Sequence, residues 1–106
     1  MDIADWRRKI DELDHQLVAL INQRAQCAVE IGRLKRDLSM PVYEPDRERV
    51  IFENIARNNG GPLSNIQLRQ IFERLVDVMR QIQGEEMMPA EKPAAAASSN
   101  ELEPQD

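Results

Sequence analysis

The sequence of 106 residues predicts an all-α protein with three helices per chain, one long and two shorter, assembled as a homodimer. Two observations predict the helices. Apolar residues recur at intervals of three and four through the first part of the chain, and helix-start and helix-stop residues bracket two later segments. The third observation predicts the dimer: the first helix is longer than the rest of the chain can cover.

The first helix is expected to run from residue 3 to residue 38. Asp2 or Asp5 can cap its start, and no proline interrupts it before Pro41. Gly32 lies inside it and costs about 1 kcal/mol relative to alanine, which predicts close packing there. Its apolar stripe consists of Ile3, Trp6, Ile10, Leu13, Leu17, Leu20, Cys27, Ile31, Leu34 and Leu38.

The ends of the second and third helices are marked by capping and turn residues. Pro45 is a favoured first-turn residue, and the Asn-Asn-Gly-Gly-Pro segment at 58–62 ends the second helix. Ser64 and Gln67 form a capping box at the start of the third helix, which is expected to end at Gly84.

Composition divides the chain into a helical domain at 1–83 and an acidic, Ala/Pro-rich tail at 84–106, which we expect to be disordered. The tail has six acids against Lys92, so the net charge of −5 belongs to it and the domain is neutral. A neutral domain argues against a nucleic-acid partner. The single Cys27, with no visible signal peptide or membrane span, favours the cytoplasm and no membrane partner.

The length of the first helix predicts the dimer. A helix over 3–38 is ~53 Å long at 1.5 Å per residue, whereas a compact domain of this size is only ~30 Å across. The helix must therefore project past its own core with its apolar stripe uncovered. A second copy would cover the stripe in a two-fold homodimer; a long exposed helix in a monomer is the alternative.

Charged residues interrupt the apolar pattern. Arg24 takes the next core position of the heptad, and Lys35 follows 11 residues later on the same face, ~16 Å away. Glu44, Arg47 and Glu48 share one face of the second helix. Structural ion pairs and a solvated first turn would explain these residues, because a buried cation is costly without an anion. A binding site for an anion is the alternative explanation.

The inventory of side chains suits a small polyanion. Arg7, Arg24, Lys35 and Arg47 supply fixed cations, whereas one histidine and one cysteine argue against proton shuttling, nucleophilic catalysis or a metal centre. A dicarboxylate is preferred, because arginine matches carboxylates in bidentate fashion and no Gly-rich phosphate loop precedes a helix. Arg7 lies ~25 Å from Arg24 along the helix, so it can reach the same pocket only from the partner of an antiparallel dimer.

Three stretches, taken together, resemble the all-helical (AroQ) class of chorismate mutases. They are WRRKIDELDHQLVALINQRAQCAVEIGRLK at 6–35, PVYEPDRERVIFENI at 41–55 and IFERLVDVMRQIQ at 71–83. The resemblance covers about residues 3–83 and is specific because all the motifs occur in order. It implies an intertwined homodimer that converts chorismate to prephenate in the synthesis of phenylalanine and tyrosine, the aromatic branch of the shikimate pathway.

The resemblance also implies roles for single residues. The arginines that grip the substrate fall on Arg24 and Arg47, with Arg7 reaching in from the other protomer. Lys35 and Gln83 match the pair that hydrogen-bonds the breaking ether oxygen. The implied reaction is an intramolecular [3,3] rearrangement of a dianion, so it needs no cofactor and no metal. Orientation of the substrate and fixed donors at the developing negative charge would supply the catalysis.

Three further positions bear on the ring and the carboxylates of the substrate. Glu48 matches the carboxylate that holds the ring hydroxyl, and Glu44 falls where the family often has a shorter acid for the same group. Met79 departs from the family, since many members have a serine there that helps to bind a carboxylate. We expect the missing hydroxyl to weaken binding by about 1 kcal/mol without removing the chemistry.

Two other functions fit the same scaffold. An isochorismate-pyruvate lyase would use the same cationic pocket, but Glu48 suits the hydroxyl that chorismate carries. A non-catalytic helical dimer that regulates another shikimate-pathway enzyme would be expected to have lost a central cation, whereas Arg7, Arg24, Lys35 and Arg47 are all present.

Overall fold

The computed structural model describes residues 1–88, which form three helices and no strand. The helices are α1 (Ile3–Leu38), α2 (Pro45–Asn58) and α3 (Asn65–Met87). The all-α class and the starts of all three helices are confirmed, as are the predicted ends of α1 and α2. No helix within the described residues is long and apolar enough to cross a membrane.

Capping residues place the helix ends. Asp2 and Asp5 form a reciprocal capping box at the start of α1, with N···O distances of 3.0 and 2.9 Å. Ser64 and Gln67 do the same for α3, as predicted. Ser39 adopts the left-handed conformation (φ 57°) and ends α1, where its N–H meets the carbonyls of Lys35 and Arg36.

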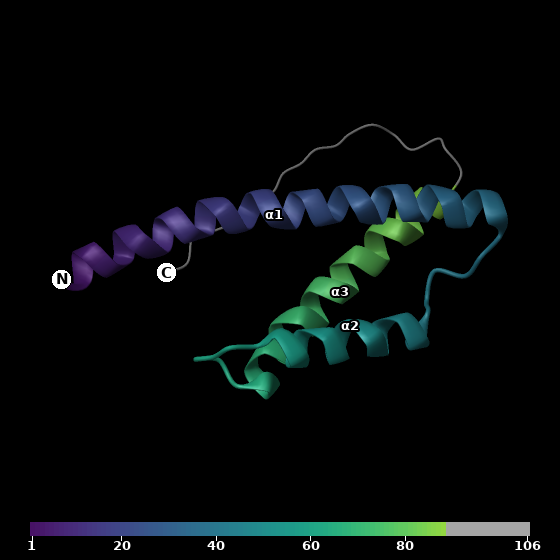
Figure 1. The fold of residues 1–106 in the computed structure, drawn as a ribbon. Coiled ribbons are helices and arrows are strands. Elements are labelled where there is room, and N and C mark those ends of the chain that lie inside the picture. The colour runs from purple at the N-terminus through teal and green to yellow at the C-terminus, as the bar shows by residue number, and fades with distance from the viewer. Residues whose placement is uncertain (89–106) are drawn as a thin grey trace.

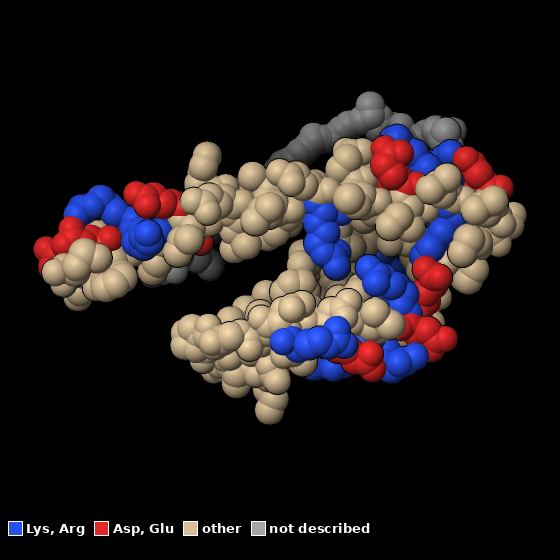
Figure 2. Space-filling model, in the orientation of Figure 1, with Lys and Arg blue, Asp and Glu red and all other residues tan. Residues whose placement is uncertain are grey.

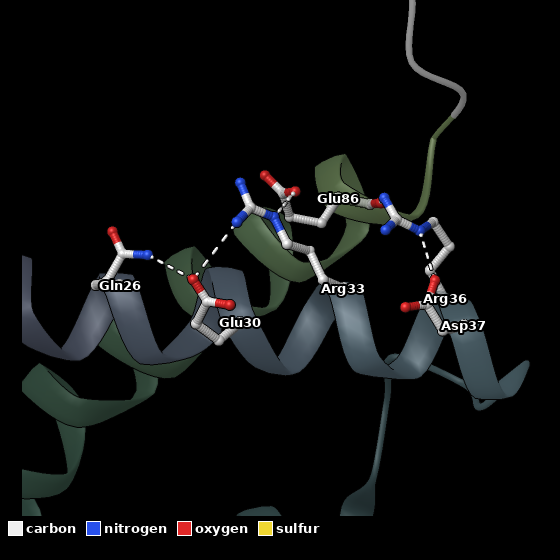
Figure 3. Close-up of polar contacts among 6 residues, drawn as sticks. All are labelled: Gln26, Glu30, Arg33, Arg36, Asp37 and Glu86. Carbon is white, nitrogen blue, oxygen red and sulfur yellow. Dashed lines mark hydrogen bonds and ion pairs between the residues drawn. The ribbon is translucent and has the colours of Figure 1, made fainter.

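The third helix does not end at Gly84, as the sequence predicted, but continues to Met87. Contacts with α1 hold this last turn (Figure 3): Arg33 Nε donates to Glu86 Oε1 at 3.1 Å, and Arg36 Nη1 donates to the Glu86 carbonyl at 3.3 Å. These contacts offset the cost of about 1 kcal/mol for a glycine within a helix. The start of the predicted tail is therefore helical, and its residues from 89 onward lie outside the described residues.

The helices are arranged around α3, which runs obliquely from the C-terminal half of α1 to α2 (Figure 1). α3 packs against both other helices, whereas α1 and α2 do not pack against each other. The longest dimension of the molecule is 53 Å, which agrees with the length expected for α1. The N-terminal half of α1 extends beyond the other two helices (Figure 1).

The buried core is small and lies where α1 and α3 cross. Among the described residues, only Ala28, Val76 and Met79 are buried apolar side chains, and Gly32 and Lys35 are buried with them. The apolar stripe along the first half of α1 is not covered by any other part of residues 1–88. Its members from this half are all at least half exposed: Ile3, Trp6, Ile10, Leu13, Leu17 and Leu20.

Gly32 permits the close approach of α3 to α1, which confirms the packing predicted at this position. A Cβ atom at Gly32 would lie 2.9 Å from the Cα of Gln83 and 3.0 Å from the Cβ of Glu86. Any side chain would therefore force the two helices apart. The approach places Gln83 beside Lys35, which follows Gly32 by less than one helical turn.

We predict that Gly32→Ala lowers the free energy of unfolding by about 1 to 3 kcal/mol, because the added methyl group overpacks the crossing. Gly84→Ala is the matched control, since a Cβ there meets nothing within 4 Å and should raise stability by roughly 0.5 to 1 kcal/mol. Urea unfolding at one protein concentration measures both. Equal stability of the two variants would contradict the close crossing.

Candidate active site

A cavity of about 370 Å³ opens between α1 and α2, with α3 as its third wall. Figure 2 shows Lys and Arg side chains gathered on both sides of this opening. The volume falls in the range of about 300 to 1,000 Å³ that is typical of small-molecule sites. Seven of the eight predicted site residues line it: Arg24, Lys35, Glu44, Arg47, Glu48, Met79 and Gln83.

Arg7 is the predicted residue that the chain does not bring to the cavity. It is exposed on the projecting half of α1 and is absent from the cavity wall. Its separation from Arg24 along α1 is ~25 Å. Its contribution from a partner chain therefore stays a proposal.

Lys35 is the buried polar centre of the site, with 5% of its surface exposed. Its Nζ donates to the carbonyl of Val42 at 2.9 Å and to Oε1 of Gln83 at 2.8 Å, and it pairs with Oε1 of Glu44 at 2.9 Å. An ammonium group has three N–H donors, and each of them has an acceptor here. The structural ion pair considered for Lys35 thus exists, with Glu44, and it lies in the wall of the cavity.

The contact with Lys35 sets the orientation of the Gln83 amide. Because an ammonium group only donates, Gln83 must turn its carbonyl oxygen toward Lys35. Its Nε2 group then faces away from Lys35, and it donates to no group within residues 1–88. The cavity therefore has a neutral donor beside a buried cation.

Arg24 and Arg47 differ from Lys35 because neither forms an ion pair within residues 1–88, although both line the cavity. The ion-pair explanation therefore does not apply to Arg24 within the described chain. The solvated-turn explanation holds for only part of the first turn of α2: Asp46 and Arg49 are exposed and pair with each other at 3.5 Å. Arg47 is exposed as well, but it lines the cavity.

Sequence reasoning missed Arg80, which lines the same cavity. Its Nε and Nη2 donate to the two oxygens of Glu48 at 3.0 and 3.1 Å, and its Nη1 donates to Asp77 at 3.1 Å. Burial lowers the pKa of the Arg80 guanidinium, but the hydrogen bonds and charges of Glu48 and Asp77 outweigh it and raise the pKa above its ordinary value. Helical spacing could have found this residue, since Arg80 shares a face with Val76 and Gln83.

The charges around the cavity leave a positive excess. Four cations line it, namely Arg24, Lys35, Arg47 and Arg80, against the carboxylates of Glu44 and Glu48. The excess of two charges matches a dianion, and the two unpaired arginines can each bind a carboxylate in bidentate fashion. Within residues 1–88, no group of three His, Cys, Asp or Glu side chains is placed to hold a metal ion.

Met79 serves packing in this site. Its side chain is 4% exposed and belongs to the small core between α1 and α3, while it also forms part of the cavity wall. A thioether offers no hydrogen-bond donor. The floor of the cavity at this position is therefore apolar, together with Ala28 and Val76.

Comparison with known proteins gives a family match over most of the chain. A family model described as chorismate mutase type II matches residues 6–84. The bifunctional chorismate mutase/prephenate dehydratase of Aquifex aeolicus is 34% identical over 79 residues, which cover 71% of this chain and 22% of that protein. The chorismate mutase of Methanocaldococcus jannaschii is 34% identical over 55 residues, 52% of this chain and 56% of that protein. The chain thus spans about a fifth of the first relative and just over half of the second.

Two solved structures share the fold. Form II of the chorismate mutase from Thermus thermophilus has a TM-score of 0.76 at 26% identity, and the match covers 77% of this chain and 93% of that one. The chorismate mutase of Helicobacter pylori in complex with prephenate has a TM-score of 0.73 at 25% identity, and the match covers 80% of this chain and 92% of that one.

Proposed function

We propose, from the premise that this chain belongs to the chorismate mutase type II family, that it converts chorismate to prephenate by an intramolecular [3,3] rearrangement. One observation carries the proposal: a cavity with an excess of two positive charges contains a buried lysine beside an amide donor. The similar Helicobacter pylori structure holds prephenate, which supports a dicarboxylate as the ligand. We place the reaction in the cytoplasm, on the route to phenylalanine and tyrosine.

The two unpaired arginines would bind the substrate. Arg24 on α1 and Arg47 on α2 lie in different walls of the cavity, so each can take one carboxylate. Holding both carboxylates presses the enolpyruvyl arm against the ring in its reactive shape. Such orientation supplies much of the rate enhancement in a reaction that has a single substrate and needs no acid, base or nucleophile from the protein.

Lys35 and Gln83 would act on the ether oxygen, where negative charge develops as the C–O bond breaks. The amide of Gln83 is already turned so that Nε2 can donate, and Lys35 is already charged and buried beside it. Donors that need no rearrangement are worth most in such a site. Lys35 must exchange one of its three acceptors for the substrate, and Glu44 is suited to release it because its side chain is 40% exposed.

Glu48 and Glu44 complete the proposed site on the side of α2. Glu48 would accept the ring hydroxyl, since each of its oxygens retains a lone pair beyond its bond to Arg80. The same contact would favour chorismate over isochorismate. Met79 would pack against the substrate without a polar contact.

We further propose that two copies form an intertwined antiparallel homodimer in which Arg7 of one copy enters the site of the other. The uncovered stripe on α1 supports it, because apolar side chains that are at least half exposed from Ile3 to Leu20 would be buried by a second copy. The small core of one chain also supports it, since three buried apolar residues are few for a stable domain.

Lys35→Ala should lower kcat/KM for chorismate by about a thousandfold, because the fixed charge at the ether oxygen is lost. Circular dichroism and elution volume should show unchanged helicity and oligomeric state. The assay is loss of chorismate absorbance, with products identified by chromatography. Lys9→Ala is the control, since Lys9 is exposed on α1 outside the cavity. A folded chain that leaves chorismate unchanged would contradict the proposed function, and release of pyruvate would indicate a lyase.

Gln83→Glu should make activity depend on pH. A carboxyl group donates a hydrogen bond only when protonated, so the variant should be about a hundredfold slower near neutral pH and recover as the pH falls through the pKa of the new carboxyl. The unmodified chain should show no such rise, because an amide does not titrate. Profiles of kcat/KM measured from about pH 4.5 to about 8 distinguish the two. Parallel profiles would exclude Gln83 as the donor.

Mixed dimers test the contribution of Arg7 from the partner. Arg7→Ala and Arg47→Ala should each abolish turnover, but subunits unfolded and refolded together in equal amounts should recover about a quarter of the unmodified activity. Half of the dimers are then mixed, and each of these has one intact site of two. A mixture no more active than the separate variants would mean that each site is built from one chain.

A further inference from the structure

We propose that Arg80 is a positioning residue for Glu48: it holds this carboxylate on the wall of the cavity and cancels its charge, so that a dianionic ligand meets the free arginines alone. The inference rests on the proposed function for the identity of the ligand. It assigns a role to a residue for which the resemblance to chorismate mutases implied none.

The geometry of the pair is a two-point clamp between helices. Arg80 on α3 and Glu48 on α2 share two parallel N–H···O bonds of 3.0 and 3.1 Å, the fork arrangement that fixes both direction and distance. Arg80 is itself held by Asp77, three residues earlier on α3, and its guanidinium carbon lies 5.3 Å from the centre of the Tyr43 ring. A restrained arginine thus restrains the carboxylate.

Partial burial supports the clamp mainly on the side of the carboxylate. The side chain of Glu48 is 20% exposed and that of Arg80 is 35% exposed, so water has limited access to the carboxylate and more to the guanidinium. The carboxylate of Glu48 forms no other hydrogen bond or ion pair within residues 1–88. Without Arg80, this carboxylate would be left with an unpaired charge in a cavity that Arg24 lines from the α1 side, and it could turn to pair with Arg24. It would then occupy the place of a substrate carboxylate.

The clamp leaves Glu48 able to accept a hydroxyl but unable to compete for the arginines. Each of its oxygens accepts one N–H from Arg80 and keeps a lone pair. Arg80, by contrast, has three of its five N–H groups engaged by carboxylates. Arg80 is therefore placed to act through Glu48 and not as a direct ligand of the substrate.

A double-mutant cycle separates these two possibilities. We expect Arg80→Met to lower kcat/KM for chorismate by about 30-fold in the unmodified chain, mainly through a higher KM, because the released Glu48 competes with the substrate. In a Glu48→Gln background, the same substitution should cost less than about threefold, since no charge is left to release. An equal loss in both backgrounds would overturn the proposal.

Two variants control for loss of fold and of charge. Arg80→Lys keeps the charge but loses the fork, and should recover part of the affinity. Arg69→Met is the matched control: Arg69 lies on the same helix, pairs with Glu73 at 3.2 Å and lies 4.2 Å from the centre of the Phe52 ring, but it is outside the cavity. Its kcat/KM should be unchanged. A comparable loss in Arg69→Met would attribute the effect to general destabilisation and overturn the proposal.

Calorimetric binding of prephenate to the same four proteins of the cycle gives a readout that does not depend on turnover. If the unmodified chain binds prephenate but leaves chorismate unchanged, the proposed function fails. The role of Arg80 would still be supported if Arg80→Met weakens the binding of prephenate more in the unmodified chain than in the Glu48→Gln background. If it turns chorismate over while the affinities are additive, only the role of Arg80 fails. A chain that neither binds prephenate nor turns over chorismate would overturn both.

Discussion

The close crossing of α1 and α3 at Gly32 is the constraint on which the rest of the structure depends. Because Gly32 has no side chain, the backbone of Gln83 comes to a distance that any Cβ would block. Lys35 is then buried beside Gln83, and its three donors are taken up by α3, by the carbonyl of Val42 in the loop and by Glu44 before α2. One ammonium group thus ties α1 both to α3, which is remote in the sequence, and to the connection that leads into α2. A buried cation is tolerated there because all its hydrogen bonds are made.

The same crossing explains why the site needs little rearrangement. Two kinds of cation line the cavity. Lys35 and Arg80 are held by carboxylates, and they in turn orient Gln83 and Glu48. Arg24 and Arg47 have no partner within residues 1–88, and they supply the attraction for an anion. The proposed reaction uses no acid, base, nucleophile or metal. Such a division of roles suits it, because charges and donors that are fixed in advance stabilise the developing charge without the cost of solvent reorganisation.

Much of the fold could be predicted from capping and spacing along helices. Spacing also brought Arg24, Lys35 and Arg47 forward as candidates for the site, whereas Met79 and Gln83 were identified through the resemblance to the family. The starts of all three helices followed from Asp2, Pro45 and Ser64, whose capping chemistry is local. Two features could not be predicted from the sequence, for a common reason. The last turn of α3 is held by contacts between Glu86 and α1, and Arg80 is identified as part of the site by Glu48 on α2. Both involve partners that are remote in the sequence.

By itself, the sequence determined where each helix begins and which face of the helix each residue occupies, since capping residues and helical periodicity act within a few residues. It also carried the ordered motifs by which the family is identified. Only the tertiary structure decided which faces meet, and hence which charges are neutralised and which stay free. Periodicity had placed Arg24 and Lys35 on one face of α1, yet in the folded chain Lys35 has three acceptors and Arg24 has no ion pair within residues 1–88. The difference arises because electrostatic pairing depends on distances of about 3 Å between helices, which no pattern within one helix specifies.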